Sequence, residues 1–245
     1  VCAIEPGTAT YYQVVIAGRY STFDLGGGAM KVFESLLMGD TYGPAYTSQQ
    51  VNNGEFLVYG DYGIVNNGVR GSSTVRMLGR PTGQTVSGAT GKFMPRLKIE
   101  AGTQTVTLSG DVGVANHYTY VSGVVVTTGS TLWVNCEYGQ TCPFVSGNVD
   151  YNNLRLSSSW GNYDLSGSVI SVLGQLTIGD TYGSGYLNQQ LSNGTFNVRG
   201  AISISPYGYR GSAVINSIGG NSTISAGATV GVPQGTFTVN KDSAA

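Results

Sequence analysis

The chain contains the same long motif twice, at a fixed separation of 140 residues. A Gly-Asp-Thr-Tyr-Gly run begins at Gly39 and again at Gly179, and the residues that follow match without insertion or deletion. Between 23–79 and 163–219, 24 of the 57 aligned pairs are identical, far more than unrelated sequences share in an ungapped alignment. The chain therefore holds two copies of one module, and its fold is built by repetition.

The same offset aligns 1–105 with 141–245 and leaves 106–140 without a counterpart. The second copy stops at the point where an equivalent of 106–140 would begin. Two domain organisations fit this pattern. Either 106–140 is a linker hairpin between two complete β modules, or it is the last part of a longer module that the second copy lacks.

Strand signals recur along the chain. Val, Ile, Thr and Tyr are concentrated in short segments bounded by Gly or Asn-Gly, at the spacing typical of antiparallel sheets. The segments with this pattern in the first 140 residues are 12–16, 55–59, 74–78, 97–100, 103–108, 118–126 and 131–135.

Residues 29–38 are ambiguous taken alone, because they contain the helix formers Met, Lys, Glu and Leu. Their counterpart, 169–178, has apolar residues in period two and a helix-weakening glycine at Gly174. We therefore predict strands in both copies.

The pair Asn53-Gly54 and its match Asn193-Gly194 separate strand-like segments. Asn-Gly is the preferred pair of type I′ hairpin turns, whose two central residues need positive φ. The expected fold is all-β: two tandem antiparallel β-sandwiches, jelly-roll-like, with one continuous stacked-β assembly as the alternative.

Charge is scarce. Only 10% of the residues are charged, with 12 Lys and Arg against 13 Asp and Glu, whereas about 25% is usual. No basic run is available to neutralise phosphates or anionic lipids, so nucleic acid is excluded as a partner. Apolar runs fall well short of the roughly 20 residues of a spanning helix, so we expect no membrane insertion.

Abundant glycine, few lysines and two Asn-x-Ser/Thr sequons, at Asn193 and Asn221, favour an exported protein. The sequence starts at Val1 without Met or an apolar leader, which fits either a removed signal peptide or a piece of a longer chain. We predict an extracellular or cell-surface location.

Cys136 and Cys142 lie close enough to close a tight loop, and in an exported chain they predict a disulfide. The offset maps Cys2 onto Cys142, so the equivalent partner of Cys2 would precede Val1. Cys2 is then free, bonded to another chain, or separated from its partner by processing. A zinc site is not expected, because the chain has one His.

The sequence offers little for catalysis. His117 is the only histidine, and the only carboxylates matched between copies are Asp24 with Asp164 and Asp40 with Asp180. Asp40 precedes Thr-Tyr-Gly, as a turn-forming aspartate does. A calcium loop of the Asp-x-Asp-x-Asp-Gly type is missing. We predict a protein that is not an enzyme and has no cofactor.

Arg70 and Arg210 are matched in a chain that has few charges. We expect structural ion pairs with Asp40 and Asp180, or with the two other matched aspartates. Recognition of an anion or a sugar by the guanidinium groups is the alternative.

Matched tyrosines and glutamines form the densest candidate surface. Tyrosine offers broad contact area, and glutamine both donates and accepts hydrogen bonds, which suits sugars and subunit interfaces. Duplication would make such a site bivalent, whereas the alternative is that these residues pack inside a long loop. The candidates are Tyr42, Tyr46, Gln49, Gln50, Tyr182, Tyr186, Gln189 and Gln190.

These features together predict a secreted, non-catalytic structural or adhesive subunit of a surface filament, such as a fimbria or fibre. If the module needs 106–140, its second copy lacks strands, and a strand from another copy of the chain would fill the gap. The alternatives are a bivalent carbohydrate-binding module, with glycans as partners, and a viral capsid or fibre protein.

Overall fold

The computed structural model describes most of the chain, and the described residues form strands and turns without a helix, so none of them forms a helix that could span a membrane. The all-β prediction is confirmed. The chain divides into two compact units: unit 1 comprises 1–115 and 119–130, and unit 2 comprises 116–118 and 131–245. The described residues are 1–18, 21–39, 49–65, 68–158, 161–179, 189–204, 209–219, 223–226 and 236–239.

The described residues of unit 1 form thirteen strands. The last strand begins at Tyr118, one residue before the segment 119–130 of this unit. They are β1 (Cys2–Ala3), β2 (Thr10–Ile16), β3 (Thr22–Asp24), β4 (Ala29–Met38), β5 (Gln50–Asn52), β6 (Glu55–Val58), β7 (Asp61–Ile64), β8 (Thr74–Met77), β9 (Gln84–Ser87), β10 (Phe93–Met94), β11 (Arg96–Ser109), β12 (Asp111–Ala115) and β13 (Tyr118–Val126).

Unit 2 contains the remaining strands. They are β14 (Thr131–Cys136), β15 (Thr141–Val145), β16 (Asp150–Tyr151), β17 (Asn153–Ser158), β18 (Asn162–Asp164), β19 (Val169–Val172), β20 (Leu176–Ile178), β21 (Gln190–Ser192), β22 (Thr195–Val198), β23 (Ile202–Ile204), β24 (Val214–Ser217), β25 (Ile224–Ala226) and β26 (Thr236–Val239).

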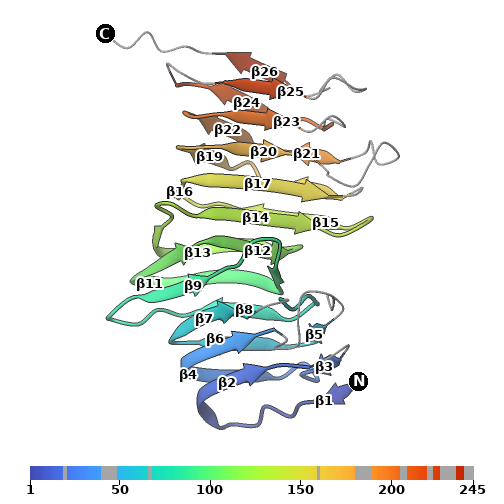
Figure 1. The fold of residues 1–245 in the computed structure, drawn as a ribbon, viewed down its shortest axis with the longest axis vertical. Helices are drawn as coiled ribbons and strands as arrows, with labels where there is room; N and C mark the ends of the chain where they lie inside the picture. Colours follow the sequence, from blue (N-terminus) through green and yellow to red (C-terminus); the bar gives the residue numbers. More distant parts are fainter. Residues whose placement is uncertain are drawn as a thin grey trace. The chain divides into compact units, whose positions relative to one another are not determined.

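In unit 1 the strands of successive coils pair in parallel. Ala29 of β4 lies beside Glu55 of β6, Glu55 beside Thr74 of β8, and Thr74 beside Arg96 of β11. Figure 1 shows β4, β6 and β8 stacked one above another. Because each strand finds its partner one coil later in the chain, the unit is a β-solenoid.

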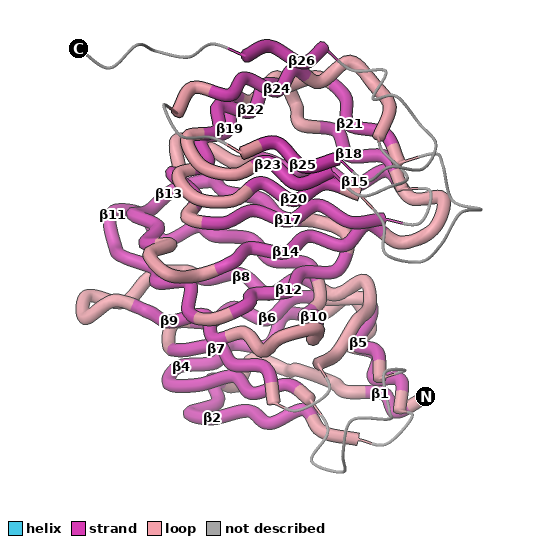
Figure 2. Tube along the Cα trace, turned by 45° about the horizontal axis from the view of Figure 1, so that its top comes forward, coloured by secondary structure: helices cyan, strands magenta, loops and turns pink. Residues whose placement is uncertain are grey.

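Unit 2 repeats this arrangement at the same offset. Val169 lies beside Thr195, Thr195 beside Val214, and Val214 beside Thr236, all in parallel register. Figure 2 shows β17, β20, β23 and β25 running side by side in another sheet of this unit. The duplication in the sequence is thus a duplication of solenoid coils.

The prediction of two antiparallel jelly-roll sandwiches is wrong, because the parallel strands of each unit form the coils of a β-solenoid. Asn53 does take a positive φ of 55°, but Asn53-Gly54 joins β5 and β6, which belong to different sheets. The turn is therefore a corner of a coil and not a hairpin. The predicted type I′ turn is also wrong, because Asn53 has a positive φ and Gly54 does not.

The predicted strands are present. Residues 29–38 form β4, and 97–100 and 103–108 lie together in β11. The counterpart 169–178 is divided into β19 and β20. The division falls at Gly174, where an added Cβ would lie 2.6 Å from the carbonyl oxygen of Asn152.

The core consists of columns of inward side chains, one from each coil. Met30, Phe56, Val75 and Leu97 occupy adjacent coils of unit 1 and are at most 5% exposed. Ile170, Phe196 and Ile215 form the same column in unit 2, completely buried. Burial of each such side chain contributes about 1.5–3 kcal/mol.

The fold requires glycine at the central position of the two matched Arg-Gly-Ser triplets. Gly71 and Gly211 have φ of 127° and 115°. A Cβ there would lie 2.1 Å from the carbonyl oxygen of Val51 or of Leu191. Only glycine fits where the corner presses against the backbone of the adjacent coil.

Candidate functional site

The predicted surface tyrosines lie outside the described residues, and so do Asp40 and Asp180, the first of the two predicted sets of partners for the arginines. Their roles at an interface, at a ligand or in ion pairs stay predictions. The residues concerned are Asp40, Tyr42, Tyr46, Asp180, Tyr182 and Tyr186.

The four matched glutamines lie within the described residues. Two of them are buried and two face solvent. Gln49 and Gln189 are 2% and 1% exposed, whereas Gln50 and Gln190 face solvent. The Gln189 side chain donates a hydrogen bond to the carbonyl oxygen of Leu156 at 3.3 Å. One glutamine of each pair therefore belongs to the interior, and only the other is available to a ligand or subunit.

Arg70 and Arg210 occupy equivalent places, each in an isolated parallel bridge with Gln50 or Gln190. The Arg70 guanidinium also lies 4.5 Å from the centre of the Phe93 ring, a cation–π contact.

The matched aspartates Asp24 and Asp164 organise corners. Asp24 accepts hydrogen bonds from the Gly26 amide at 2.8 Å and from the Asn53 side chain at 2.9 Å. Asp164 accepts the equivalent bonds in unit 2, including one from the Asn193 side chain at 3.2 Å. Such bonds are typical of turn-forming aspartates.

The predicted disulfide is present. Cys136 and Cys142 are bonded, with their Cα atoms 5.8 Å apart, and both are buried. Cys2, which aligns with Cys142, is exposed and carries a free thiol.

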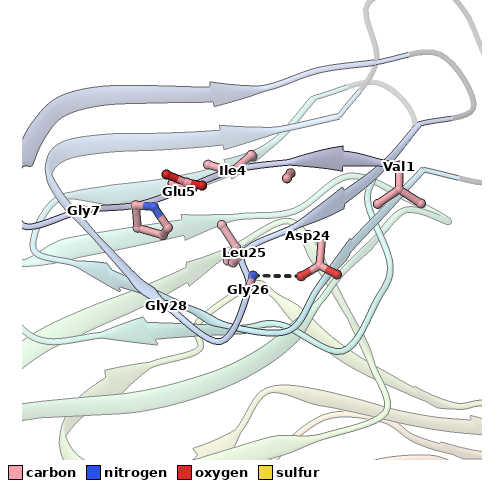
Figure 3. A pocket seen from close by; sticks show the side chains of 10 residues that line it. Val1, Ile4, Glu5, Gly7, Asp24, Leu25, Gly26 and Gly28 are labelled. Carbon is pink, nitrogen blue, oxygen red and sulfur yellow. Dashed lines mark hydrogen bonds between the residues drawn. The ribbon is translucent and has the colours of Figure 1, made fainter.

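A pocket of about 580 Å³ lies beside β1 in unit 1. We call it the β1 pocket. Figure 3 shows Ile4 and Glu5 on one side, and Leu25 and Asp24 with its hydrogen bond to the Gly26 amide on the other. Its wall is more apolar than polar, with two carboxylates.

In unit 2, the residue that aligns with Ile4 of the pocket packs against aromatic rings. Phe144 aligns with Ile4 and is fully buried. Its ring centre lies 5.3 Å from that of Tyr118 and 5.9 Å from that of Tyr151.

A second hollow of about 320 Å³ lies on an outer face of unit 1, between the 80–83 turn and strands β7, β9 and β11. We call it the threonine groove. It is much more polar than the β1 pocket, and the polar residues that line it are Asp61, Arg80, Thr82, Gln84, Thr85, Thr105 and Thr107.

Two arginines of unit 1 bridge carboxylates on neighbouring coils. Arg80 pairs with Glu34 at 3.3 Å and with Asp61 at 3.5 Å. Arg76 pairs with Glu55 at 2.8 Å and with Glu100 at 2.7 Å. Hydrogen bonding to Glu55, and next to Glu100, raises the pKa of Arg76.

The hydrogen bond from Arg76 lowers the pKa of the Glu100 carboxyl. At pH values above the ordinary Glu pKa of about 4.3, the ionised Glu100 carboxylate therefore stabilises the folded state fully through its bond with Arg76. This stabilisation is lost as the pH falls through the lowered pKa of Glu100 in the folded state.

Asp61 and Arg80 were not predicted as site residues, because the predicted residues were chosen for being matched between the two copies. Their counterparts are Ala201 and Gly220. A search for charges present in one copy alone would have found them. Among the described residues, no group of three or more His, Cys, Asp or Glu is arranged to hold a metal ion.

No protein-family model, curated protein or solved structure matches this chain in comparisons with known proteins.

Proposed function

We propose that the protein is a non-catalytic structural and adhesive subunit of an extracellular filament, and that its solenoid coils stack on those of further copies. The supporting observation is a difference between equivalent edges of the two units. Within the described residues, β1 pairs only with β3 and β2 only with β4. In unit 2, the equivalent of β2 is paired on both sides.

That equivalent is β17. Thr131–Cys136 of β14 lies along one edge of β17, and β20 lies along the other. The burial of side chains differs accordingly. Leu154 of β17 is completely buried, whereas its counterpart Val14 of β2 is only half-buried. An uncovered β edge has unpaired N–H and C=O groups that favour pairing with another strand.

The edge strand also exposes apolar side chains. Tyr12 is 69% exposed and Val15 is 57% exposed on β2, and the β1 pocket is adjacent to β1. Contact between the β2 edge of one copy and a different surface of the next copy is heterologous, and repetition of such a contact produces a filament. This mode replaces strand donation into a sandwich, since a solenoid has no slot between two sheets.

The test is assembly of the purified chain as its concentration rises, followed by sedimentation velocity and electron microscopy. We expect fibres, and we expect Val15→Lys to raise the concentration needed for assembly by about tenfold or more, because a charge blocks edge pairing. Val124→Lys is the matched control. Val124 is 54% exposed on β13 of the same unit, and its substitution should leave assembly unchanged.

A chain that stays monomeric at every concentration would contradict the proposal. So would an equal effect of Val15→Lys and Val124→Lys, because the contact would then not depend on β2.

A further inference from the structure

The threonine groove lies on a column of short polar side chains, one from each of four coils. Ser35 pairs with Asp61, and Thr85 pairs with Thr107, in parallel register. The Thr85 amide donates a hydrogen bond to Asp61 Oδ1 at 2.8 Å, which joins the two pairs. All four side chains face outward, since the residue after each is a core residue on the opposite face.

Arg80 stands beside this column in a defined position. Its Nε donates to the carbonyl oxygen of Gly83 at 3.1 Å, within a turn closed by the Gly83 amide on the Arg80 carbonyl. Its two other nitrogens contact Glu34 and Asp61. A guanidinium held in this way loses little side-chain entropy when a ligand binds.

The fold does not need these charges. In the second copy, Glu34 is replaced by Gly174 and Asp61 by Ala201. The coil nevertheless keeps its parallel register, with Ile178 beside Ile204 as Met38 lies beside Ile64. The coil therefore forms without the charged groups of the groove.

We propose that the threonine groove binds a neutral, hydroxyl-rich ligand: a carbohydrate. Two carboxylates surround one guanidinium, so the local charge is negative and an anionic ligand is disfavoured. Sugar hydroxyls donate to carboxylates and accept from a guanidinium, and the threonine hydroxyls do both. A divalent cation is disfavoured because Arg80 occupies the space between the carboxylates.

The size of the groove limits the size of the ligand and its affinity. A volume of about 320 Å³ is at the lower end for small-molecule sites and fits one or two sugar residues. The groove is open to water, so each hydrogen bond contributes only about 1 kcal/mol net. We therefore expect a weak site, with a dissociation constant of about 1 mM.

The test is a screen of the intact protein on a glycan array containing neutral and acidic oligosaccharides, with titration of the best neutral glycan by NMR. We expect Arg80→Ala and the isosteric Thr107→Val each to weaken binding by about tenfold. We also expect the largest shifts of amide signals at Thr85 and Thr107.

Arg76→Ala is the matched control. Arg76 has nearly the same side-chain exposure as Arg80, 25% against 26%, and also bridges two carboxylates. It does not line the groove. Its substitution should leave glycan binding unchanged, and circular dichroism of all variants should match that of the native protein.

Three results would overturn the proposal: no neutral glycan bound at about 10 mM, equal loss of binding in Arg76→Ala, or preference for acidic glycans or calcium. The proposal does not depend on filament formation. Glycan titrations of the Val15→Lys variant, under conditions where the protein is monomeric, distinguish a failure of glycan binding from a failure of filament formation.

Discussion

Tyr209 occupies the place that Val69 takes in the first copy, and its hydroxyl is a polar group inside an apolar core. The side chain is 2% exposed, and no described residue provides a hydrogen-bond partner for the hydroxyl. Burial raises the pKa of Tyr209 to about 12. The ionised form is therefore more costly in the folded state than in the unfolded state.

Tyr209→Phe should preserve stability at neutral pH and improve it in alkali. An unfolded tyrosine ionises near pH 10, so the raised folded pKa makes the native protein lose stability as pH rises from about 10 to 12. At pH 11 the free energy of unfolding of the variant should exceed that of the native protein by about 1 kcal/mol. Urea unfolding at pH 7 and pH 11 measures this difference.

Tyr12→Phe is the control for that experiment, because Tyr12 is 69% exposed. It should follow the native protein at both pH values. If Tyr209→Phe also follows the native protein at pH 11, burial of the phenol does not set its ionisation.

At the scale of the element, the disulfide joins the end of β14 to the next strand along the chain, β15. The intervening loop is short, with a sequence separation of 6. The bond restricts the unfolded chain more than the folded one, which stabilises the protein by about 2 kcal/mol for a loop of this length.

Replacement of both Cys136 and Cys142 by serine should therefore lower the free energy of unfolding by about 2 kcal/mol. Cys2→Ser should have no such effect, because Cys2 is exposed and free. Denaturant titration under oxidising conditions measures both variants. A double variant as stable as the native protein would show that the bond restricts nothing in the unfolded state.

Within each unit, stability is distributed along the coils, each of which contacts its neighbours. Phe56 and Phe196 are matched residues of the core columns, and both are completely buried. They belong to different compact units. Because the two residues are equivalent, their substitution tests how far a local loss of packing extends along the coils of each unit.

Phe56→Ala and Phe196→Ala should each cost about 3–5 kcal/mol, because each leaves a cavity in a close-packed column. Hydrogen exchange followed by mass spectrometry should show lost protection in β4, β6 and β8 for the first variant. The second should lose it in β19, β22 and β24. Uniform loss across both units in either variant would contradict a stack with local contacts.

Several properties of this protein follow from its sequence alone. The fixed offset identified two copies of one module, and period-two alternation in 169–178 predicted strands in both copies, including β4. The loop between Cys136 and Cys142 was short enough to predict their bond. Each of these features depends on residues that are close in the chain or on direct comparison of the copies.

Tertiary structure alone decided the strand partners. Period-two alternation is the same in parallel and antiparallel sheets, and an Asn-Gly turn with positive φ serves a hairpin or a coil corner equally well. Arg76 meets Glu55 and Glu100, 21 and 24 residues away, only because parallel coils bring them together. The threonine groove arises in the same way, since Asp61, Thr85 and Thr107 are neighbours across coils although they lie far apart along the chain.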